Sequence, residues 1–403
     1  MSKVSIGEVS SIIRGVSYKK EQAQKEADDN SLFLVRANNI SNGTFNNEDC
    51  VYIPRNLVSR DQYVCAGDIV ITMSSGSKAH VGKVALAKKD MDCTFGAFCA
   101  KIVPTRIDPA YLFYILQSPD FRQYIEKQCK GTNINNLKQS YIYNYIIELP
   151  ALDEQRRIVS RIEELFSQLD ASVATMRKVK EQLGVYRQAV LKEAFDGAFI
   201  SDVSEKNRAM RIDEFANVDT GSTPLTTNKA YYNGQIAWVA SGKVNDGLIY
   251  SPTSYITDLA IRDTNCKIFP AGTLVVAMYG EGKTRGKCAE LMIPAATNQA
   301  LAAITLKEDS PVDKMFLKWY LEYNYQMIRR KASGGVQPNL NLGIIKAITV
   351  NVSSKEAQRE TVVQIEMRLS ICESIEQTVD AVLQQAEAMK QSILKQAFKE
   401  DLK

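Results

Sequence analysis

The chain repeats part of itself at a fixed interval, and this repeat constrains the fold more than any other feature. The stretch EQRRIVSRIE (Glu154–Glu163) resembles AQRETVVQIE (Ala357–Glu366), and QAVLKEAF (Gln188–Phe195) resembles QSILKQAF (Gln391–Phe398), with both counterparts 203 residues further along the chain. The segments that precede these blocks match more loosely. We therefore expect a duplicated chain in which each half joins a variable block to a well-matched block.

The well-matched blocks have the pattern of long amphipathic helices. Apolar residues recur at steps of three and four, and no proline interrupts residues 151–200. Neither helix can bury its stripe alone, so we expect the two to pack on each other as an antiparallel coiled coil, with a compact domain returning the chain between them. The residues expected at this contact or at a partner-docking surface are Gln155, Arg156, Ile158, Ile162, Leu165, Leu169, Leu183, Tyr186, Gln358, Arg359, Ile365, Leu369, Leu383 and Ile393.

The variable blocks mix short strands and turns with one helical patch each. In the first block DIVITM and KVALAKK flank the turn SSGSKAHVG, and residues 109–128 have helical spacing; in the second, TLVVAM and KCAELMI flank YGEGKTRG, and the matching helix spans 312–331. Each variable block should therefore be a compact α/β (α+β) domain. The expected boundaries are 1–150 and 201–352 for the two globular domains, and 151–200 and 353–403 for the two helices.

The stretch YGEGKTRG contains the Gly-Lys-Thr of a phosphate-binding loop. A P-loop also needs a glycine five residues before Gly282, where this chain has Ala277, and a helix after the threonine, where a strand-like sequence follows. We therefore expect a glycine-rich hairpin and no nucleoside triphosphate site. Exposed amides, hydroxyls and cations in such a hairpin suit contact with DNA phosphates or base edges, although an ordinary turn has the same composition.

A second loop before each long helix is rich in amide side chains, which read adenine in the major groove but also cap helices and build turns. The formal net charge is +4, and the part of the chain outside the two helical blocks contains 35 Lys and Arg residues and 29 Asp and Glu residues. This excess favours the variable blocks as the site of an anionic partner, and it equally fits a solvated surface. The DNA-binding candidates are Arg36, Asn38, Asn39, Ser75, Ser77, Lys78, Lys83, Asn133, Asn135, Thr223, Lys243, Tyr279, Lys283, Arg285, Lys287, Gln337 and Asn339.

Other chemistry is poorly represented. His80 is the only histidine, the eight cysteines form no CxxC pair, and the chain lacks the [DNS]PP[YFW] signature of adenine methyltransferases. We expect reduced thiols and no metal site. No apolar run reaches the roughly 18 residues that a membrane helix needs, and the first residues lack a signal-peptide pattern, so we expect a cytoplasmic protein.

The stretch LPALDEQRRIVSRIEELF, followed by YRQAVLKEAFDG, resembles the central conserved region of the specificity (S) subunits of type I restriction-modification enzymes, the HsdS family. The second copy resembles the distal conserved region and is more divergent, and Thr220–Ile249 resembles the opening of a family recognition domain. The resemblance covers essentially all 403 residues. It implies two target-recognition domains in a pseudo-twofold repeat, each reading one half of a bipartite, asymmetric DNA site, with the paired helices setting the spacer.

The resemblance also implies partners. Two methyltransferase (M) subunits would dock on the helices and methylate adenine N6 with S-adenosylmethionine, and two restriction (R) subunits would add ATP- and Mg-dependent translocation and cleavage. The resemblance implies no catalysis by this chain and no cofactor on it. Two alternatives remain open from the residues: a coiled-coil adaptor that does not read DNA, and a P-loop-like nucleotide-dependent enzyme.

Overall fold

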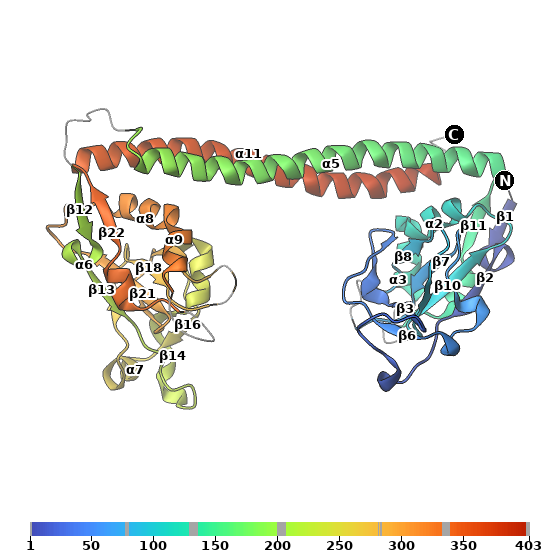
Figure 1. The fold of residues 1–403 in the computed structure, drawn as a ribbon, viewed down its shortest axis with the longest axis horizontal. Coiled ribbons are helices and arrows are strands. Elements are labelled where there is room, and N and C mark those ends of the chain that lie inside the picture. Colours follow the sequence, from blue (N-terminus) through green and yellow to red (C-terminus); the bar gives the residue numbers. More distant parts are fainter. Residues whose placement is uncertain are drawn as a thin grey trace. The chain divides into compact units, whose positions relative to one another are not determined.

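The computed structural model describes residues 2–76, 80–128, 136–199, 207–280, 282, 284–332 and 339–399. The chain forms two compact units, one made of Met1–Arg177 and Asp380–Lys403 and the other of Lys178–Val379. Each unit combines a globular α/β part with one portion of each of two long helices, α5 (Leu152–Phe195) and α11 (Lys355–Ala397) (Figure 1).

The globular part of the first unit is built on two small sheets. The larger has the order β2-β10-β7-β8 and the smaller the order β6-β3-β9, in which β3 and β9 are parallel. A separate pair, β1 (Ser2–Ser5) with β11 (Ile146–Leu149), brings the start of the chain beside the entry to α5. The remaining strands are β2 (Ser10–Arg14), β3 (Ser31–Val35), β4 (Ile40–Ser41), β5 (Thr44–Phe45), β6 (Tyr52–Pro54), β7 (Ile69–Thr72), β8 (Val84–Leu86), β9 (Cys93–Phe95) and β10 (Cys99–Pro104).

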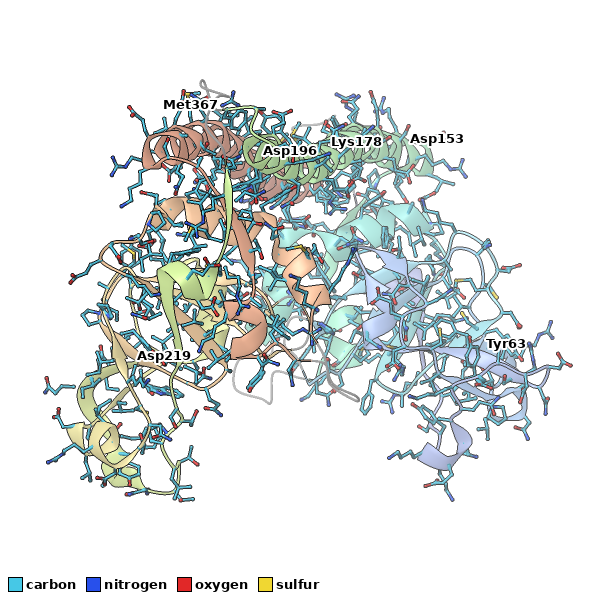
Figure 2. The ribbon with its side chains drawn as sticks, turned by 60° about the vertical axis from the view of Figure 1, so that its left-hand side comes forward. Tyr63, Asp153, Lys178, Asp196, Asp219 and Met367 are labelled. Carbon is cyan, nitrogen blue, oxygen red and sulfur yellow. The ribbon has the colours of Figure 1, made fainter. Side chains whose placement is uncertain are left out.

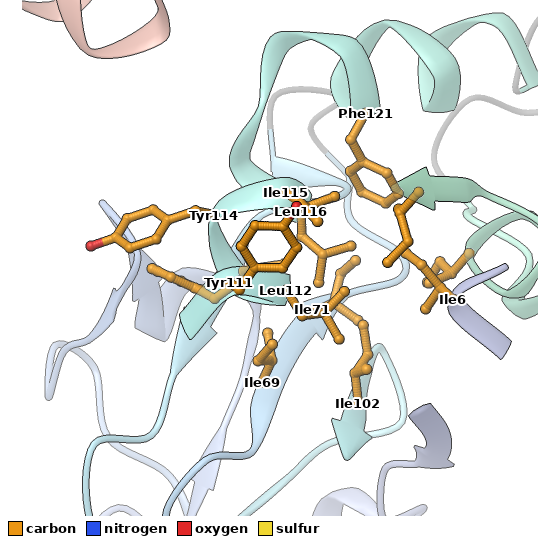
Figure 3. Packing of buried hydrophobic residues seen from close by; sticks show 14 of the residues in the cluster. Ile6, Ile69, Ile71, Ile102, Tyr111, Leu112, Tyr114, Ile115, Leu116 and Phe121 are labelled. Carbon is orange, nitrogen blue, oxygen red and sulfur yellow. The ribbon is translucent and has the colours of Figure 1, made fainter. Parts of the chain in front are cut away.

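The helices of this part cover the larger sheet. They are α1 (Ile6–Val9), α2 (Pro109–Gln117), α3 (Pro119–Gln128) and α4 (Gln139–Tyr143), with 3-10 turns at Lys20–Gln22, Ala37–Asn39, Arg55–Leu57 and Arg60–Gln62. Figure 3 shows Leu112, Ile115 and Leu116 of α2 packed over Ile69, Ile71 and Ile102 of the sheet, and all six side chains are buried.

The prediction of one helix over 109–128 is wrong in one respect: the segment forms two helices, α2 and α3, separated at Ser118. A proline disfavours helical geometry in the residue before it, so Pro119 ends α2 and begins α3. The prediction over 312–331 fails in the same way. There α8 (Lys314–Tyr323) and α9 (Tyr325–Arg330) meet at Asn324, whose side-chain amide donates to the Tyr320 carbonyl oxygen at 3.0 Å.

The second unit repeats this plan. Its sheets have the orders β13-β21-β18-β19-β15 and β16-β14-β20-β17, and β12 pairs with β22 as β1 does with β11. The strands are β12 (Arg208–Arg211), β13 (Ala216–Thr220), β14 (Tyr232–Val239), β15 (Leu248–Ile249), β16 (Ser254–Ile256), β17 (Ile268–Phe269), β18 (Leu274–Ala277), β19 (Cys288–Leu291), β20 (Ala295–Thr297), β21 (Leu301–Leu306) and β22 (Thr349–Val352). The helices besides α8 and α9 are α6 (Ile212–Phe215), α7 (Asp258–Asp263) and α10 (Leu342–Lys346), with 3-10 turns at Lys229–Tyr231 and Ser241–Asp246.

The two long helices pack on each other within each unit, as predicted. In the first unit Ile158 and Ile162 of α5 share a core with Leu394 and Ala397 of α11. In the second unit Val190, Leu191 and Ala194 of α5 share a core with Ile365, Leu369 and Cys372 of α11. The beginning of α5 therefore meets the end of α11, and the end of α5 meets the beginning of α11, which is antiparallel pairing.

The described cysteines are free thiols, and three of them are chemically quiet. Burial raises the pKa of Cys93, Cys99 and Cys288 to about 12, so the nucleophilic thiolate is scarce at neutral pH. Among the described residues no helix is long and apolar enough to span a membrane, and no three His, Cys, Asp or Glu residues cluster as a metal site would require.

Candidate nucleic-acid interface

The glycine-rich stretch is a hairpin turn in both units. In the first unit the Gly82 amide donates to the Thr72 carbonyl at 2.9 Å, and in the second the Gly286 amide donates to the Ala277 carbonyl at 2.8 Å. Both glycines have positive φ, +81° and +87°, a backbone conformation that would be strained for a residue with a side chain. After Gly286 the chain enters strand β19, so the helix that a P-loop needs is absent there, as the sequence predicted.

Three loops meet at one edge of each unit, and equivalent backbone hydrogen bonds hold them. In the first unit the Leu137 amide donates to the Met73 carbonyl at 2.7 Å, and the Met73 amide donates to the Phe98 carbonyl at 2.8 Å. These bonds join the β7–β8 loop (73–83) to the β9–β10 loop (96–98) and to the end of the amide-rich loop, where Ser74 also bridges to Asn136.

The second unit has the same assembly. The Leu340 amide donates to the Met278 carbonyl at 3.0 Å, and the Met278 amide donates to the Ala300 carbonyl at 2.8 Å. The β18–β19 loop (278–287), the β20–β21 loop (298–300) and the end of the second amide-rich loop are thus joined as in the first unit. The two loops predicted to contact DNA are therefore neighbours in each unit, together with a third loop that the sequence did not indicate.

The candidate residues in these loops fall into two groups. Ser77, Lys78, Asn133, Asn135, Lys283 and Gln337 lie outside the described residues. Among the others, Ser75, Lys83, Arg285, Lys287 and Asn339 are half-buried and Tyr279 is 40% exposed. Lys287 is held by its Nζ, which donates to Asn245 Oδ1 at 2.7 Å.

The candidates upstream of these loops are mostly engaged within the protein. The Asn39 prediction is wrong as a DNA contact, because this side chain is 0% exposed and its amide nitrogen donates to the Glu48 carbonyl at 2.7 Å. Its side chain stabilises a turn instead. Arg36 pairs with the Asp49 carboxylate at 2.9 Å, whereas Asn38 is exposed.

Two candidates of the second unit also have internal partners. Lys243 Nζ lies 3.0 Å from Asp246 and 3.2 Å from the Ser251 hydroxyl. The Thr223 hydroxyl donates to Gln299 Oε1 at 2.5 Å, and Gln299 belongs to the β20–β21 loop. Thr223 therefore acts on the loop assembly through a neighbouring side chain.

The candidates on the long helices divide by burial. Ile158, Ile162, Ile365 and Leu369 are buried in the contacts between α5 and α11, whereas Leu165, Leu169, Leu183, Leu383 and Ile393 are half-buried along the helices. Arg156, Tyr186 and Arg359 are exposed.

Gln155 and Gln358 were expected at a coiled-coil or docking surface, and this is wrong because both are buried and bonded inside their own unit. Gln155 Oε1 accepts from the Asp108 amide at 2.8 Å, and its Nε2 donates to the Pro150 carbonyl at 2.9 Å. Gln358 Oε1 accepts from the Asp313 amide at 2.7 Å, and its Nε2 donates to the Ser353 carbonyl at 2.8 Å, the counterpart of Pro150. The same Nε2 also donates to the Pro311 carbonyl at 2.9 Å.

Each glutamine thus fastens the start of a long helix to the start of a helix in the globular part. Asp108 caps α2 through the amides of Ala110 and Tyr111, and Asp313 caps α8 through the amides of Met315 and Phe316. We call the hydrogen bonds of Gln155 and of Gln358 to these capped helices the glutamine lock. An Asp-capped helix before each glutamine is the sequence signal that could have revealed it.

The sequence also missed an exposed apolar row on α11. Val363, Met367, Ile371 and Ile375 are spaced four residues apart and are 59%, 52%, 59% and 41% exposed, and Met367 is labelled in Figure 2. Side chains four residues apart lie on one face of a helix. The positions that match them on α5 hold Ser160, Glu164, Gln168 and Ser172, all exposed.

Comparison with known proteins agrees with this duplicated plan. The family model described as "Type I restriction modification DNA specificity domain" matches the chain twice, over residues 1–183 and 204–384. The EcoKI specificity subunit of Escherichia coli (strain K12) is 30% identical over 416 residues, which cover 98% of this chain and 88% of that protein. The StySPI specificity subunit of Salmonella potsdam is 28% identical over 411 residues, with 98% and 88% covered.

Solved structures share the fold. One chain, from work on complex assembly and conformational transition of the type I R-M system, aligns with a TM-score of 0.75 at 18% identity, covering 100% of this chain and 98% of that one. The HsdS subunit from Thermoanaerobacter tengcongensis aligns with a TM-score of 0.56 at 18% identity, covering 100% and 97%. The chain belongs to the family of DNA specificity subunits of type I restriction-modification enzymes.

Proposed function

We propose that each globular domain, 1–150 and 201–352, reads one half of a bipartite, asymmetric DNA site through its three-loop edge. The observation that carries this proposal is the repeated loop assembly, in which the same backbone hydrogen bonds hold loops of different sequence in the two units. The backbone hydrogen bonds are the same in the two units, whereas the side chains of the loops differ. This arrangement suits two domains that recognise different half-sites, since base edges are distinguished by the side chains that reach them.

We propose that the chain itself carries no catalysis and that two M subunits dock on its helices. The exposed apolar row from Val363 to Ile375 supports docking of one partner on α11, because covering an apolar helical face with a partner helix lowers the free energy. The M subunits would supply S-adenosylmethionine and methylate adenine N6. Two R subunits would add translocation and cleavage that depend on ATP and Mg²⁺. Because the substrate is DNA in the cell, we propose that the complex is cytoplasmic.

Methylation mapping tests this function. The chain is expressed with its M subunit in a methylation-free host, and the DNA is sequenced by a method that reports N6-methyladenine. We expect one bipartite motif, methylated on both strands and separated by a fixed nonspecific spacer. An associated complex that methylates nothing would contradict the DNA-reading proposal and favour the adaptor alternative.

The cations of the β18–β19 loop give a prediction about affinity. Replacing Lys283 and Arg285 by alanine should weaken DNA binding about tenfold at moderate salt and reduce the slope of log affinity against log salt by one to two, because each phosphate contact releases counterions. Fluorescence anisotropy with a duplex measures both. Association with the M subunit should be unchanged in size-exclusion chromatography.

The matched control for this prediction removes two cations from a long helix. Arg177 and Lys178 are exposed on α5, so their replacement by alanine should leave the salt slope unchanged. If the loop variant instead loses the M subunit and keeps its DNA affinity, the assignment of DNA to the loops and of partners to the helices is wrong.

A further inference from the structure

The β9–β10 loop of the first unit (96–98), the third loop of the candidate interface, exposes a large apolar side chain. Phe98 is 70% exposed, which is unusual for a phenylalanine. Its carbonyl oxygen accepts from the Met73 amide at 2.8 Å and from the Ser74 amide at 3.1 Å. The ring is thus attached at the point where the β9–β10 loop supports the β7–β8 loop, within the candidate interface.

The backbone under this ring is fixed. The Cys99 amide donates to the Gly96 carbonyl at 2.8 Å, and the Gly96 amide donates to the Val35 carbonyl at 3.0 Å. These bonds anchor the β9–β10 loop to both sheets of the unit. A pre-positioned apolar ring loses little conformational entropy when a ligand covers it.

The second unit places different chemistry at the same point. Ala300 occupies the backbone position of Phe98, since its carbonyl accepts from the Met278 amide, but Ala300 is only 8% exposed. The side chain presented beside it is Gln299, which is exposed and whose Oε1 accepts from the Thr223 hydroxyl. The first unit therefore presents a phenyl ring where the second presents an oriented carboxamide.

These two side chains match different base edges. The C5 methyl of thymine is the apolar group that a base offers in the major groove, and phenylalanine is one of the side chains that contact it. A carboxamide instead recognises hydrogen-bonding edges, above all adenine. We propose that the β9–β10 loop and its counterpart are a third base-reading element, in which Phe98 contacts a thymine methyl group in the half-site of the first domain.

This inference rests on the proposed function, and its experiment separates the two. Duplexes carrying the mapped motif are prepared with each thymine of both half-sites replaced in turn by uracil, which removes only the methyl group. Their affinities for the complex of this chain with its M subunit are measured at one salt concentration, for the wild type and for Phe98→Ala.

We expect the wild type to lose about fourfold in affinity at one thymine, the factor for one buried methyl group. Phe98→Ala should bind the unmodified duplex at least fourfold more weakly and lose nothing further with uracil at that position. Gln299→Ala, the matched variant of the other unit, should keep the full response to that uracil and weaken recognition of the other half-site.

Three results overturn the inference. They are an unchanged affinity of Phe98→Ala, a response to uracil that persists in Phe98→Ala, and the absence of any wild-type response to uracil in either half-site. In each case specific binding of the motif would remain, so the DNA-reading function would stand. Loss of specific binding by the wild-type complex would instead refute that function. Ile146→Ala controls for removal of an exposed apolar side chain, because Ile146 is 57% exposed on β11, outside the loops, and should have no effect.

Discussion

Removing four residues from each long helix is expected to shorten the spacer of the DNA site by about two base pairs. Four residues of α-helix span about 6 Å, and one base-pair step spans about 3.4 Å. Because each helix contributes to both compact units, its length enters the separation of the two half-sites directly if the paired helices act as the ruler.

The deletions that test this are Ala174–Arg177 in α5 and Gln377–Asp380 in α11, which are matched positions of the repeat. A four-residue step returns the apolar stripe to nearly the same face of the helix, so the contact between the helices is retained. Neither deletion includes a residue of the glutamine lock or of the three loops. Methylation mapping of the variant complex gives the new motif.

The expected motif has both half-sites unchanged and only the spacer shortened. As a control, Ala174–Arg177 and Gln377–Asp380 are each replaced by four alanines, which keeps both helix lengths and should keep the spacer. Retained methylation at the original spacer in the deletion variant would show that the helices do not set the distance between the half-sites.

The long helices could be predicted from the sequence because their signal is local and repeated. Apolar residues at steps of three and four, without proline, predicted one long helix within 151–200 and another within 353–403, and α5 and α11 have 44 and 43 residues. Ile162 and Ile365 are fully buried at the expected face, 203 residues apart. Duplication made the pattern more reliable, since one copy tests the other.

The candidate site was harder to predict, because the exposure of its side chains and the position of its loops depend on contacts that form only in the folded chain. Nothing near Asn39 in the sequence indicates that its amide donates to Glu48, and nothing near Phe98 indicates that its ring stays exposed. The β7–β8 loop joins the other two loops through hydrogen bonds between residues far apart in sequence, from Met73 to Phe98 and from Leu137 to Met73. A local pattern carries no record of such contacts.

The glutamine lock gives the second large effect. Gln155→Ala should lower the free energy of unfolding by about 2 kcal/mol, because the Asp108 amide and the Pro150 carbonyl each lose a partner in a largely buried site. Gln358→Ala should cost about 3 kcal/mol, because the Pro311 carbonyl, 2.9 Å from Gln358 Nε2, loses its partner as well. Chemical denaturation measures both free energies of unfolding. The sharper test is whether Gln358→Ala is the less stable of the two variants.

A charge-specific variant distinguishes the lock from simple packing. In Gln155→Glu the side chain keeps its size and still accepts from the Asp108 amide, but an ionised carboxylate cannot donate to the Pro150 carbonyl and places charge beside it. This variant should therefore be at least as unstable as Gln155→Ala, whereas a site that needed only volume would tolerate it. Arg156→Ala, the exposed neighbour on α5, should change stability by less than about 0.5 kcal/mol.

The lock also has a consequence for DNA reading. If Gln155 fixes the first globular domain on its helix, its loss should let that domain tilt, so that methylation tolerates spacers one base pair longer or shorter. Competition between duplexes with different spacers measures this tolerance in Gln155→Ala and Gln358→Ala. Destabilised variants that keep the strict spacer of the wild type would restrict the two glutamines to stability and leave the domain angle to the apolar contacts beneath α2 and α8.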